Sequence, residues 1–345
     1  MIGFFEHQKS GCMLYRTKHP MDMLNANGVP SSFIQINVDI DSNVYDAMKA
    51  VQVYGIYPFR FEHVLKIIHA DGKRIVYDMD DALDLIDPVN PFFHAVKRDA
   101  GSRDEILRLI DQITVSTPVM RDLLLSKTDI PITVVPNCYE PKEWTFTRPK
   151  RGGIRIGFAG SPTHVGDLID VIPAIRNLQA KYDVRFLIMG LGPSTYESFV
   201  KDMRYTCAPE GVKAVDELDR ELSTIKFEWI PYVDYDNYPA TLTNLALDIG
   251  LCPLKDTPFN RARSACKAME YTLAGALAIA SDMPGYRDDH SSVLVYEPND
   301  WEKVLENYIK FPEIREEVRL QHLDWLQKNR KVDSQLEILK QVYGV

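Results

Sequence analysis

The sequence of 345 residues predicts an α/β fold in which two doubly wound parallel-sheet domains face a central cleft. Three observations lead to this prediction. Short apolar runs alternate with amphipathic, helix-like segments along most of the chain. The alternation pauses once, in a polar stretch that contains proline and glycine, and then begins again. The runs themselves are apolar, as strands are when helices cover a parallel sheet on both faces.

The first domain is expected over residues 1–148. One predicted helix spans Pro58–Ala70, where apolar residues recur at spacings of three and four, and another spans Pro118–Leu125. Between the helix-like segments, the predicted strands are Ile2–Phe5, Phe33–Ile36, Val51–Tyr54, Arg74–Tyr77, Ile113–Ser116 and Ile132–Val135.

The second domain is expected over residues 149–322, after a polar linker that begins at Pro136. Helices are predicted over about 167–182, 238–246 and 264–274, and the chain from Asp300 onward is helical and charged. The predicted strands of this domain are Ile154–Ala159, Val184–Met189, Ile225–Trp229, Asp248–Leu251, Leu277–Ala280 and Val293–Tyr296.

Composition excludes several classes of protein. The formal charge is −9, from 40 basic and 49 acidic residues, which disfavours nucleic acid as the main partner. The five cysteines are far apart and form no CxxC or CxH pair, so neither a zinc knuckle nor a disulfide framework is supported. No apolar run is long enough to cross a bilayer, and the first residues do not form a secretory leader. We therefore expect a cytoplasmic protein.

Ligands of such folds bind where loops leave the carboxyl ends of the strands. The loop after Ile154–Ala159 reads Gly160-Ser-Pro-Thr-His-Val-Gly-Asp and precedes a helix. Its glycines, the hydroxyls of Ser161 and Thr163, and the free N–H groups of the helix start predict an anion site, with His164 beside it. A tight turn with Asp167 as a helix cap is the alternative, and His164 alone is more often structural than catalytic. Gly190 begins a second, weaker loop of this kind.

The stretch from Phe259 to Ser281 is the most informative one. Ser264 is expected to cap a helix on which Lys267 and Glu270 follow at spacings of three, so the three share one face. A cation at the amino end of a helix opposes the helix dipole, and a bound anion would relieve that cost. Arg261 and Arg263 add positive charge, while Glu270 suits the vicinal hydroxyls of a ribose. An ordinary exposed helix face is the alternative.

The run Lys267-x-x-Glu270-Tyr-x-x-x-Gly275-x-x-x-Ile279-Ala-Ser281 resembles the sugar-nucleotide motif of retaining GT-B glycosyltransferases, of the family 4 (group 1) type. The resemblance extends over nearly the whole chain. Further segments that resemble the family, in the same order, are Gly11–Pro20, Val135-Pro-Asn137, Ile154–Gly160, Phe186–Gly192 and Phe227–Tyr232.

The resemblance implies a GT-B fold and the transfer of a hexosyl or pentosyl group from a nucleoside-diphosphate sugar, with retention and with no obligatory cofactor. It also implies that the carboxyl-terminal helix, 323–345, packs back on the first domain, with Trp301 and Trp325 as anchors. Lys267 and Arg263 would stabilise the leaving diphosphate. The implied nucleotide-sugar site comprises Gly160, Ser161, Thr163, His164, Gly190, Ile230, Pro231, Asn260, Arg261, Ser264, Lys267 and Glu270.

One position departs from the family pattern. Members often carry two glutamates eight positions apart, and the position eight before Glu270 is Ala262. In the family the first glutamate lies near the donor sugar. Its replacement leaves the identity of the sugar open, and Asn260, Arg261 and Arg263 are candidates to substitute for it.

Asp78, Asp80 and Asp81 follow the predicted strand Arg74–Tyr77 at the cleft. Clustered carboxylates repel one another unless a cation or hydroxyl groups lie near. We expect Asp78 and Asp80 to contact sugar hydroxyls or the acceptor as catalytic residues. A divalent metal at Asp78 and Asp80 is a second option, and a helix cap by Asp81 is a third.

Two other functions stay open at this point. The chain could be a non-catalytic nucleotide-sugar-binding protein, or a glycosyltransferase that acts on a hydroxymethylated DNA base. A glycan, a protein and a lipid-linked sugar are equally open as acceptors, because the loops of the first domain carry little sequence code for them.

Overall fold

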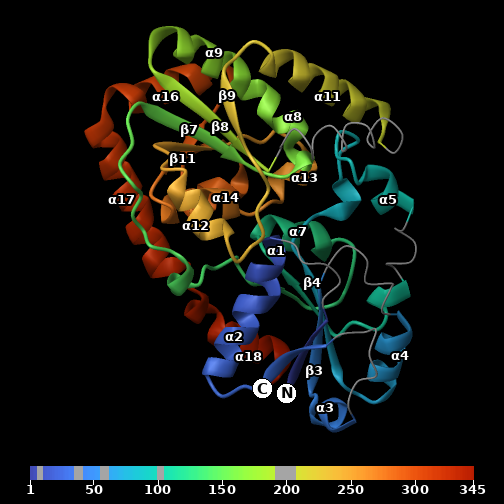
Figure 1. Ribbon diagram of the computed structural model, residues 1–345. Helices are drawn as coiled ribbons and strands as arrows, with labels where there is room; N and C mark the ends of the chain where they lie inside the picture. Colours follow the sequence, from blue (N-terminus) through green and yellow to red (C-terminus); the bar gives the residue numbers. More distant parts are fainter. Residues whose placement is uncertain (6–10, 35–41, 55–61, 99–104, 191–206) are drawn as a thin grey trace.

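Two parallel six-stranded sheets form the centre of the computed structural model, which describes residues 1–5, 11–34, 42–54, 62–98, 105–190 and 207–345. Figure 1 shows them in two lobes, with the first half of the chain in one lobe and most of the second half in the other. Each lobe carries helices around its sheet, as the alternation in the sequence predicts.

The first sheet has the strand order β2-β1-β3-β4-β5-β6. Its strands are β1 (Ile2–Phe5), β2 (Ser31–Ile34), β3 (Ala50–Tyr54), β4 (Arg74–Met79), β5 (Gln112–Val115) and β6 (Ile132–Val134). The helices of this lobe are α1 (Gly11–Met13), a π-helical turn (Leu14–Lys18), α2 (His19–Ala26), α3 (Ser42–Ala47), α4 (Glu62–Ala70), α5 (Phe93–Arg98) and α7 (Pro118–Leu125).

The second sheet has the order β12-β11-β10-β7-β8-β9. Its strands are β7 (Ile154–Ala159), β8 (Val184–Met189), β9 (Phe227–Ile230), β10 (Ile249–Cys252), β11 (Leu277–Ser281) and β12 (Val293–Val295). The described α-helices that follow β7 are α8 (Val165–Leu168), α9 (Ile172–Lys181), α11 (Pro209–Leu222), α12 (Tyr238–Asn244), α13 (Pro258–Arg261), α14 (Cys266–Leu273), α15 (Pro284–Asp289), α16 (Trp301–Lys310), α17 (Pro312–Asn329) and α18 (Leu336–Tyr343), of which α18 packs on the first lobe.

Both sheets reverse their winding direction at one point. In the second sheet, β8 and β9 lie on one side of β7, and β10 lies on the other. In the first sheet the reversal falls between β1 and β3. The carboxyl ends of the strands at such a switch point are the usual ligand-binding edge of a doubly wound sheet.

Apolar clusters cover both faces of the second sheet. One contains Ile175 of α9, Leu218 of α11 and Leu305 of α16, packed on strand residues such as Ile156. The other contains residues of α12, α14 and α17. Because helices bury both faces, the strands are predominantly apolar.

The end of the chain returns to the first lobe. α17 runs along the side of the molecule, and α18 lies near α2 (Figure 1). Leu339 and Val342 of α18 pack in one cluster with Ile2 and Phe4 of β1. Of the two expected anchors, Trp301 is buried in the core of the second sheet, and Trp325 stacks edge-on with His290. The proposed domain boundaries at 148 and 322 stay predictions.

The predicted strands are confirmed with ends shifted by one or two residues, and one shift matters: β4 continues to Met79 and therefore includes Asp78. The helix expected over about 167–182 divides into α8, a 3₁₀ turn (Ile169–Val171) and α9. Pro173, in the first turn of α9, cannot donate a backbone hydrogen bond to the preceding turn, which explains the interruption. Residues 35–36, 58–61 and 191–192 of the predicted elements lie outside the described residues.

Candidate functional site

A cavity of about 400 Å³ lies between the two lobes and is lined by both of them. It borders the ends of β7 and β10, the switch point of the second sheet, through Ala159 and Leu254. From the first lobe, Tyr15, Asp80 and Asn137 face it. The expected residues that line the cavity are Gly160, Ser161, His164, Gly190, Arg263, Ser264, Lys267, Glu270 and Asp80.

Two glycines let the loops after β7 and β8 pack backbone against backbone. Gly190 has a φ of +90°, and a Cβ atom there would lie 2.6 Å from the carbonyl oxygen of Gly160. A Cβ atom on Gly160 would lie 2.6 Å from the ring of Phe158. The cavity wall at this point is therefore backbone rather than side chain, which suits the close approach of a phosphate.

His164 is part of a buried polar group behind this loop. Its Nδ1 lies 2.9 Å from Oδ2 of Asp167, and the other oxygen of Asp167 accepts from the amide of Asn260 at 3.0 Å. Burial, together with the charges of Lys267 and Arg263, lowers the pKa of His164 to about 4. The imidazole is therefore neutral at pH 7. Asp167 does not cap this helix, because it lies within α8, whose N-cap position is His164.

Lys267 and Glu270 point into the cavity from one face of α14, as their spacing predicts. The Nζ atom of Lys267 donates to the carbonyl oxygen of Ala159 at 2.5 Å and lies 5.2 Å from the centre of the Phe158 ring. Burial lowers the pKa of Lys267, and the nearby Glu270 opposes this effect. A desolvated ammonium group beside a backbone-walled loop is well placed to bind an anion.

Two tyrosines hold the carboxylate of Glu270. The hydroxyl of Tyr15 donates to Oε1 at 2.8 Å, and the hydroxyl of Tyr238 donates to Oε2 at 2.9 Å. Burial raises the pKa of Glu270, while Lys267 and the two tyrosine hydrogen bonds lower it. A carboxylate has about four acceptor positions, so it can still accept hydrogen bonds from a diol.

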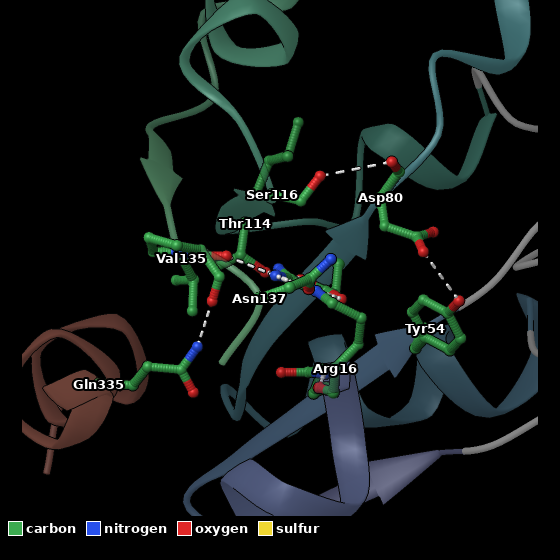
Figure 2. A network of polar contacts seen from close by, with 12 residues as sticks. Arg16, Tyr54, Asp80, Thr114, Ser116, Val135, Asn137 and Gln335 are labelled. Carbon is green, nitrogen blue, oxygen red and sulfur yellow. Dashed lines mark hydrogen bonds and ion pairs between the residues drawn. The ribbon is translucent and has the colours of Figure 1, made fainter. Parts of the chain in front are cut away.

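On the side of the first lobe, Asp80 and Asp81 face the cavity. Asp80 accepts a hydrogen bond of 3.2 Å from the hydroxyl of Tyr54 (Figure 2), and Asp81 lies 3.9 Å from Nε of Arg263 in the opposite lobe. Burial, followed by repulsion from Asp81, raises the pKa of Asp80 to about 7. Asp80 can therefore hold or release a proton near neutral pH.

The expected role of Asp78 is wrong. Because β4 extends to Met79, the Asp78 side chain turns into the lobe, where it is 2% exposed. Its oxygens accept from Arg16 at 2.5 and 2.8 Å and from Thr114 at 2.5 Å. These contacts leave no free face for a sugar hydroxyl or a metal ion, so the donor set does not fit a metal shared by Asp78 and Asp80. The described part of the chain contains no group of three His, Cys, Asp or Glu side chains that could hold a metal.

Several other expected residues lie outside the cavity lining. Arg261 is exposed at the surface and pairs with Asp256, which also lies in solvent. Thr163 and Asn260 line a separate cavity of about 60 Å³. The backbone carbonyl oxygen of Ile230 accepts a hydrogen bond from the backbone N–H group of Gly190, and Pro231 is exposed. Neither residue type nor the order of motifs along the chain determines the direction in which a side chain points.

Ser264 lies at the cavity but does not cap the helix. α14 begins two residues later than expected, at Cys266, and its N-cap Ala265 makes no side-chain hydrogen bond. The Ser264 hydroxyl instead accepts a hydrogen bond of 2.9 Å from the side chain of Asn137.

Ala262, at the position where the motif that the sequence resembles often has its first glutamate, is a contact between the lobes. It is 1% exposed and packs in the apolar cluster of the first lobe with Met120. Its carbonyl oxygen accepts a hydrogen bond of 2.8 Å from Thr117. A longer, charged side chain would have to displace this packing.

Sequence reasoning did not find Tyr15, Tyr238 or Asn137 as site residues, although Tyr15 and Asn137 lie in motifs that resemble the family. All three hydrogen-bond residues in or just before α14, and their places in a loop or at the start of a helix do not indicate this in the sequence. Arg16 and His19, which lie close to Tyr15 in the Gly11–Pro20 segment, are buried.

No family model matches the sequence, and no curated protein matches it. No helix of the described residues is long and apolar enough to span a membrane.

Solved structures share the fold. A sucrose-phosphate synthase from Thermosynechococcus elongatus aligns with a TM-score of 0.67 and 12% identity, over 99% of this chain and 98% of that chain. A trehalose-6-phosphate synthase, studied for glycosyl transfer with retention, aligns with a TM-score of 0.66 and 13% identity, over 100% and 99%. HepE from Anabaena, in complex with UDP and glucose, aligns with a TM-score of 0.67 and 10% identity, over 99% of each chain. These likenesses confirm the predicted GT-B fold of two Rossmann-like domains.

Proposed function

We propose that this chain is a glycosyltransferase that moves a hexosyl or pentosyl group from a nucleoside-diphosphate sugar to an acceptor hydroxyl, with retention at the anomeric carbon. One observation carries the proposal. Lys267, Arg263 and Glu270 line one cavity with the backbone of Gly160 and Gly190, at the switch point of the second sheet.

The two halves of this arrangement suit the two halves of such a donor. The cationic side chains of Lys267 and Arg263 and the backbone loop suit a diphosphate. The carboxylate of Glu270, three residues further along α14, suits the vicinal hydroxyls of a ribose. Support also comes from HepE, which has the same fold and was solved with UDP and glucose.

Transfer breaks the bond between the anomeric carbon and the diphosphate oxygen, so negative charge develops on that oxygen. Lys267 and Arg263 lie in place to stabilise this charge before the reaction begins. The acceptor hydroxyl forms the new bond on the face from which the diphosphate departs, and its proton passes to the leaving phosphate oxygen. The imidazole of His164 is neutral at pH 7 and therefore contributes no positive charge to this stabilisation.

The acceptor is proposed to enter from the first lobe, where Asp80 and Asp81 face the cavity. Their carboxylates can accept hydrogen bonds from acceptor hydroxyls and orient the attacking oxygen. Asp80 and Arg263 thereby retain the catalytic roles first assigned from the sequence, whereas Asp78 becomes a buried structural residue.

A donor panel tests this function. The protein is incubated with UDP-, GDP- and ADP-sugars, and release of the nucleoside diphosphate is followed by mass spectrometry. We expect slow release from one donor class through hydrolysis, and at least about a 100-fold loss of release in Lys267→Ala, because one preorganised donor contributes that much. Thermal stabilisation by a nucleotide sugar without any release would indicate a non-catalytic binding protein. If no donor binds, the proposal is wrong.

A further inference from the structure

We propose that Asn137 is a positioning residue, which ties the start of α14 to the buried core of the first lobe and so sets the place of Lys267 and Glu270. The proposal rests on the function proposed above, because it gives those two side chains their purpose. Asn137 itself is 7% exposed and lies three residues after the end of β6, in the segment that links the lobes.

The amide group of Asn137 joins two elements. Its Oδ1 accepts a hydrogen bond of 3.1 Å from Nη1 of Arg16. Its Nδ2 donates to the hydroxyl of Ser264 at 2.9 Å and lies 2.9 Å from Sγ of Cys266. A guanidinium group only donates hydrogen bonds, so the oxygen of the amide must face Arg16 and the NH₂ group must face α14.

Arg16 gives this bridge a rigid base. Arg16 is 3% exposed and makes a bidentate ion pair with Asp78. The carboxylate of Asp78 also accepts a hydrogen bond from the hydroxyl of Thr114. Another Arg16 hydrogen bond goes to the carbonyl group of Val135, two residues before Asn137. Figure 2 shows Arg16, Thr114 and Asn137 together at the centre of this network. A bidentate arginine–carboxylate pair restricts the orientation of the guanidinium group, so Arg16 has little freedom to move.

The other end of the bridge lacks support of its own. The N-cap of α14 is Ala265, which offers no side-chain acceptor to the free N–H groups of the first turn. Asn137 contacts the residues on either side of Ala265, and Lys267 follows directly. A shift of this turn would move the ammonium group of Lys267 in the cavity.

The same residues form a wall between two spaces. Asn137, Ser264 and Cys266 line the 400 Å³ cavity, and they also line a second cavity of about 240 Å³ between the lobes. Shortening the side chain of Asn137 would open this wall, and water from the 240 Å³ cavity could then reach the start of α14.

Asn137→Ala tests the proposal, and Thr117→Val is the matched control. Thr117 also makes a buried hydrogen bond of 2.8 Å between the lobes, to the carbonyl group of Ala262, but its side chain hydrogen-bonds Ala262 and the backbone N–H of Met120 rather than α14. Amide hydrogen exchange is measured by mass spectrometry for residues 264–273 and for residues 11–18 in both variants. We expect exchange in the first turn of α14 to become about tenfold faster in Asn137→Ala only, with residues 11–18 unchanged.

Affinity for UDP, GDP and ADP is titrated in parallel. The nucleotide that binds the wild-type protein should bind Asn137→Ala about tenfold more weakly and Thr117→Val within about twofold of the wild type. Equal acceleration of exchange in both segments, or equal losses in both variants, would overturn the proposal, since Asn137 would then only hold the lobes together. If no nucleotide binds the wild-type protein, the proposed function fails while the exchange data still decide the role of Asn137. Should Asn137→Ala not fold, Ser264→Ala removes one of the two contacts between Asn137 and the start of α14, leaves the Arg16 side intact, and should accelerate exchange in the same segment to a smaller extent.

Discussion

The hydroxyl of Tyr15 donates a hydrogen bond of 2.8 Å to Oε1 of Glu270, although the two residues are 255 positions apart in the sequence. Tyr238, from the same lobe as Glu270, donates to the other oxygen. A carboxylate proposed to bind the donor is therefore held from both lobes. Its orientation depends on the lobes being together.

Replacing Tyr15 by Phe should shift the pH dependence of nucleotide binding. The Tyr15 hydrogen bond lowers the pKa of Glu270, so its loss raises that pKa further, and the carboxylate becomes neutral at a higher pH. We expect affinity to fall about three- to tenfold at the acidic end of the measured range and less at pH 8. Calorimetric titration between pH 5 and 8 measures the effect, and Tyr238→Phe should shift the profile in the same direction. An unchanged profile in both variants would mean that Glu270 does not bind the nucleotide.

Two neighbouring arginines make a matched pair. Arg263 lines the cavity and faces Asp81, whereas Arg261 is exposed and pairs with Asp256. Arg263→Ala should lower donor turnover at least about 100-fold, while Arg261→Ala should leave turnover within about twofold. Single-turnover assays with the donor found in the panel provide the measurement. Equal losses in both variants would contradict the placement of Arg263 in the site.

Asp80 should make stability depend on pH. Burial and Asp81 raise its pKa from 3.8 to about 7, so the folded protein keeps a proton that the unfolded chain releases. The resulting stabilisation is complete below about pH 4 and is lost as pH rises through 7. Asp80→Asn mimics the protonated form, and its melting temperature should exceed that of the wild type at pH 8 but match it at pH 4. The exposed control Asp234→Asn should show the same difference at both pH values.

Ala262→Glu should destabilise the contact between the lobes. The new carboxylate would enter the apolar cluster around Met120 without a cationic partner, at a cost of roughly 3 kcal/mol or more. We expect a lower melting temperature and no gain in transfer, whereas Ala262→Ser should lose much less. A stable, more active glutamate variant would show that position 262 can serve the donor sugar after all.

The order of strands and helices could be predicted because it depends on local pattern. Apolar runs such as Ile154–Ala159 and the helix after Ser264 are visible without any knowledge of their neighbours. The spacing of Lys267 and Glu270 was sufficient to place both side chains on one face, and both line the cavity.

The errors have a common physical cause, since each depended on partners distant in the sequence. Two extra residues in β4 turned Asp78 toward Arg16 and away from the cleft. Arg261 and Arg263 look alike in the sequence, but only the packing of Ala262 between them against the first lobe decides which one faces the cavity. A single sequence contains no record of such contacts.

The chain passes between the lobes twice, side by side. Tyr139 on the outward passage exchanges backbone hydrogen bonds with Arg330 and Val332 on the return, at 2.9 and 3.0 Å. A single cut at the linker would therefore leave each fragment incomplete. α18 would stay with the second lobe, and Phe4 of the first lobe would lose its apolar contacts with that helix. An independently folding first lobe would have to be built by joining residues 1–138 directly to 332–345 through a short turn. Because the first lobe contains both the beginning and the end of the chain, a simple truncation cannot separate the two lobes.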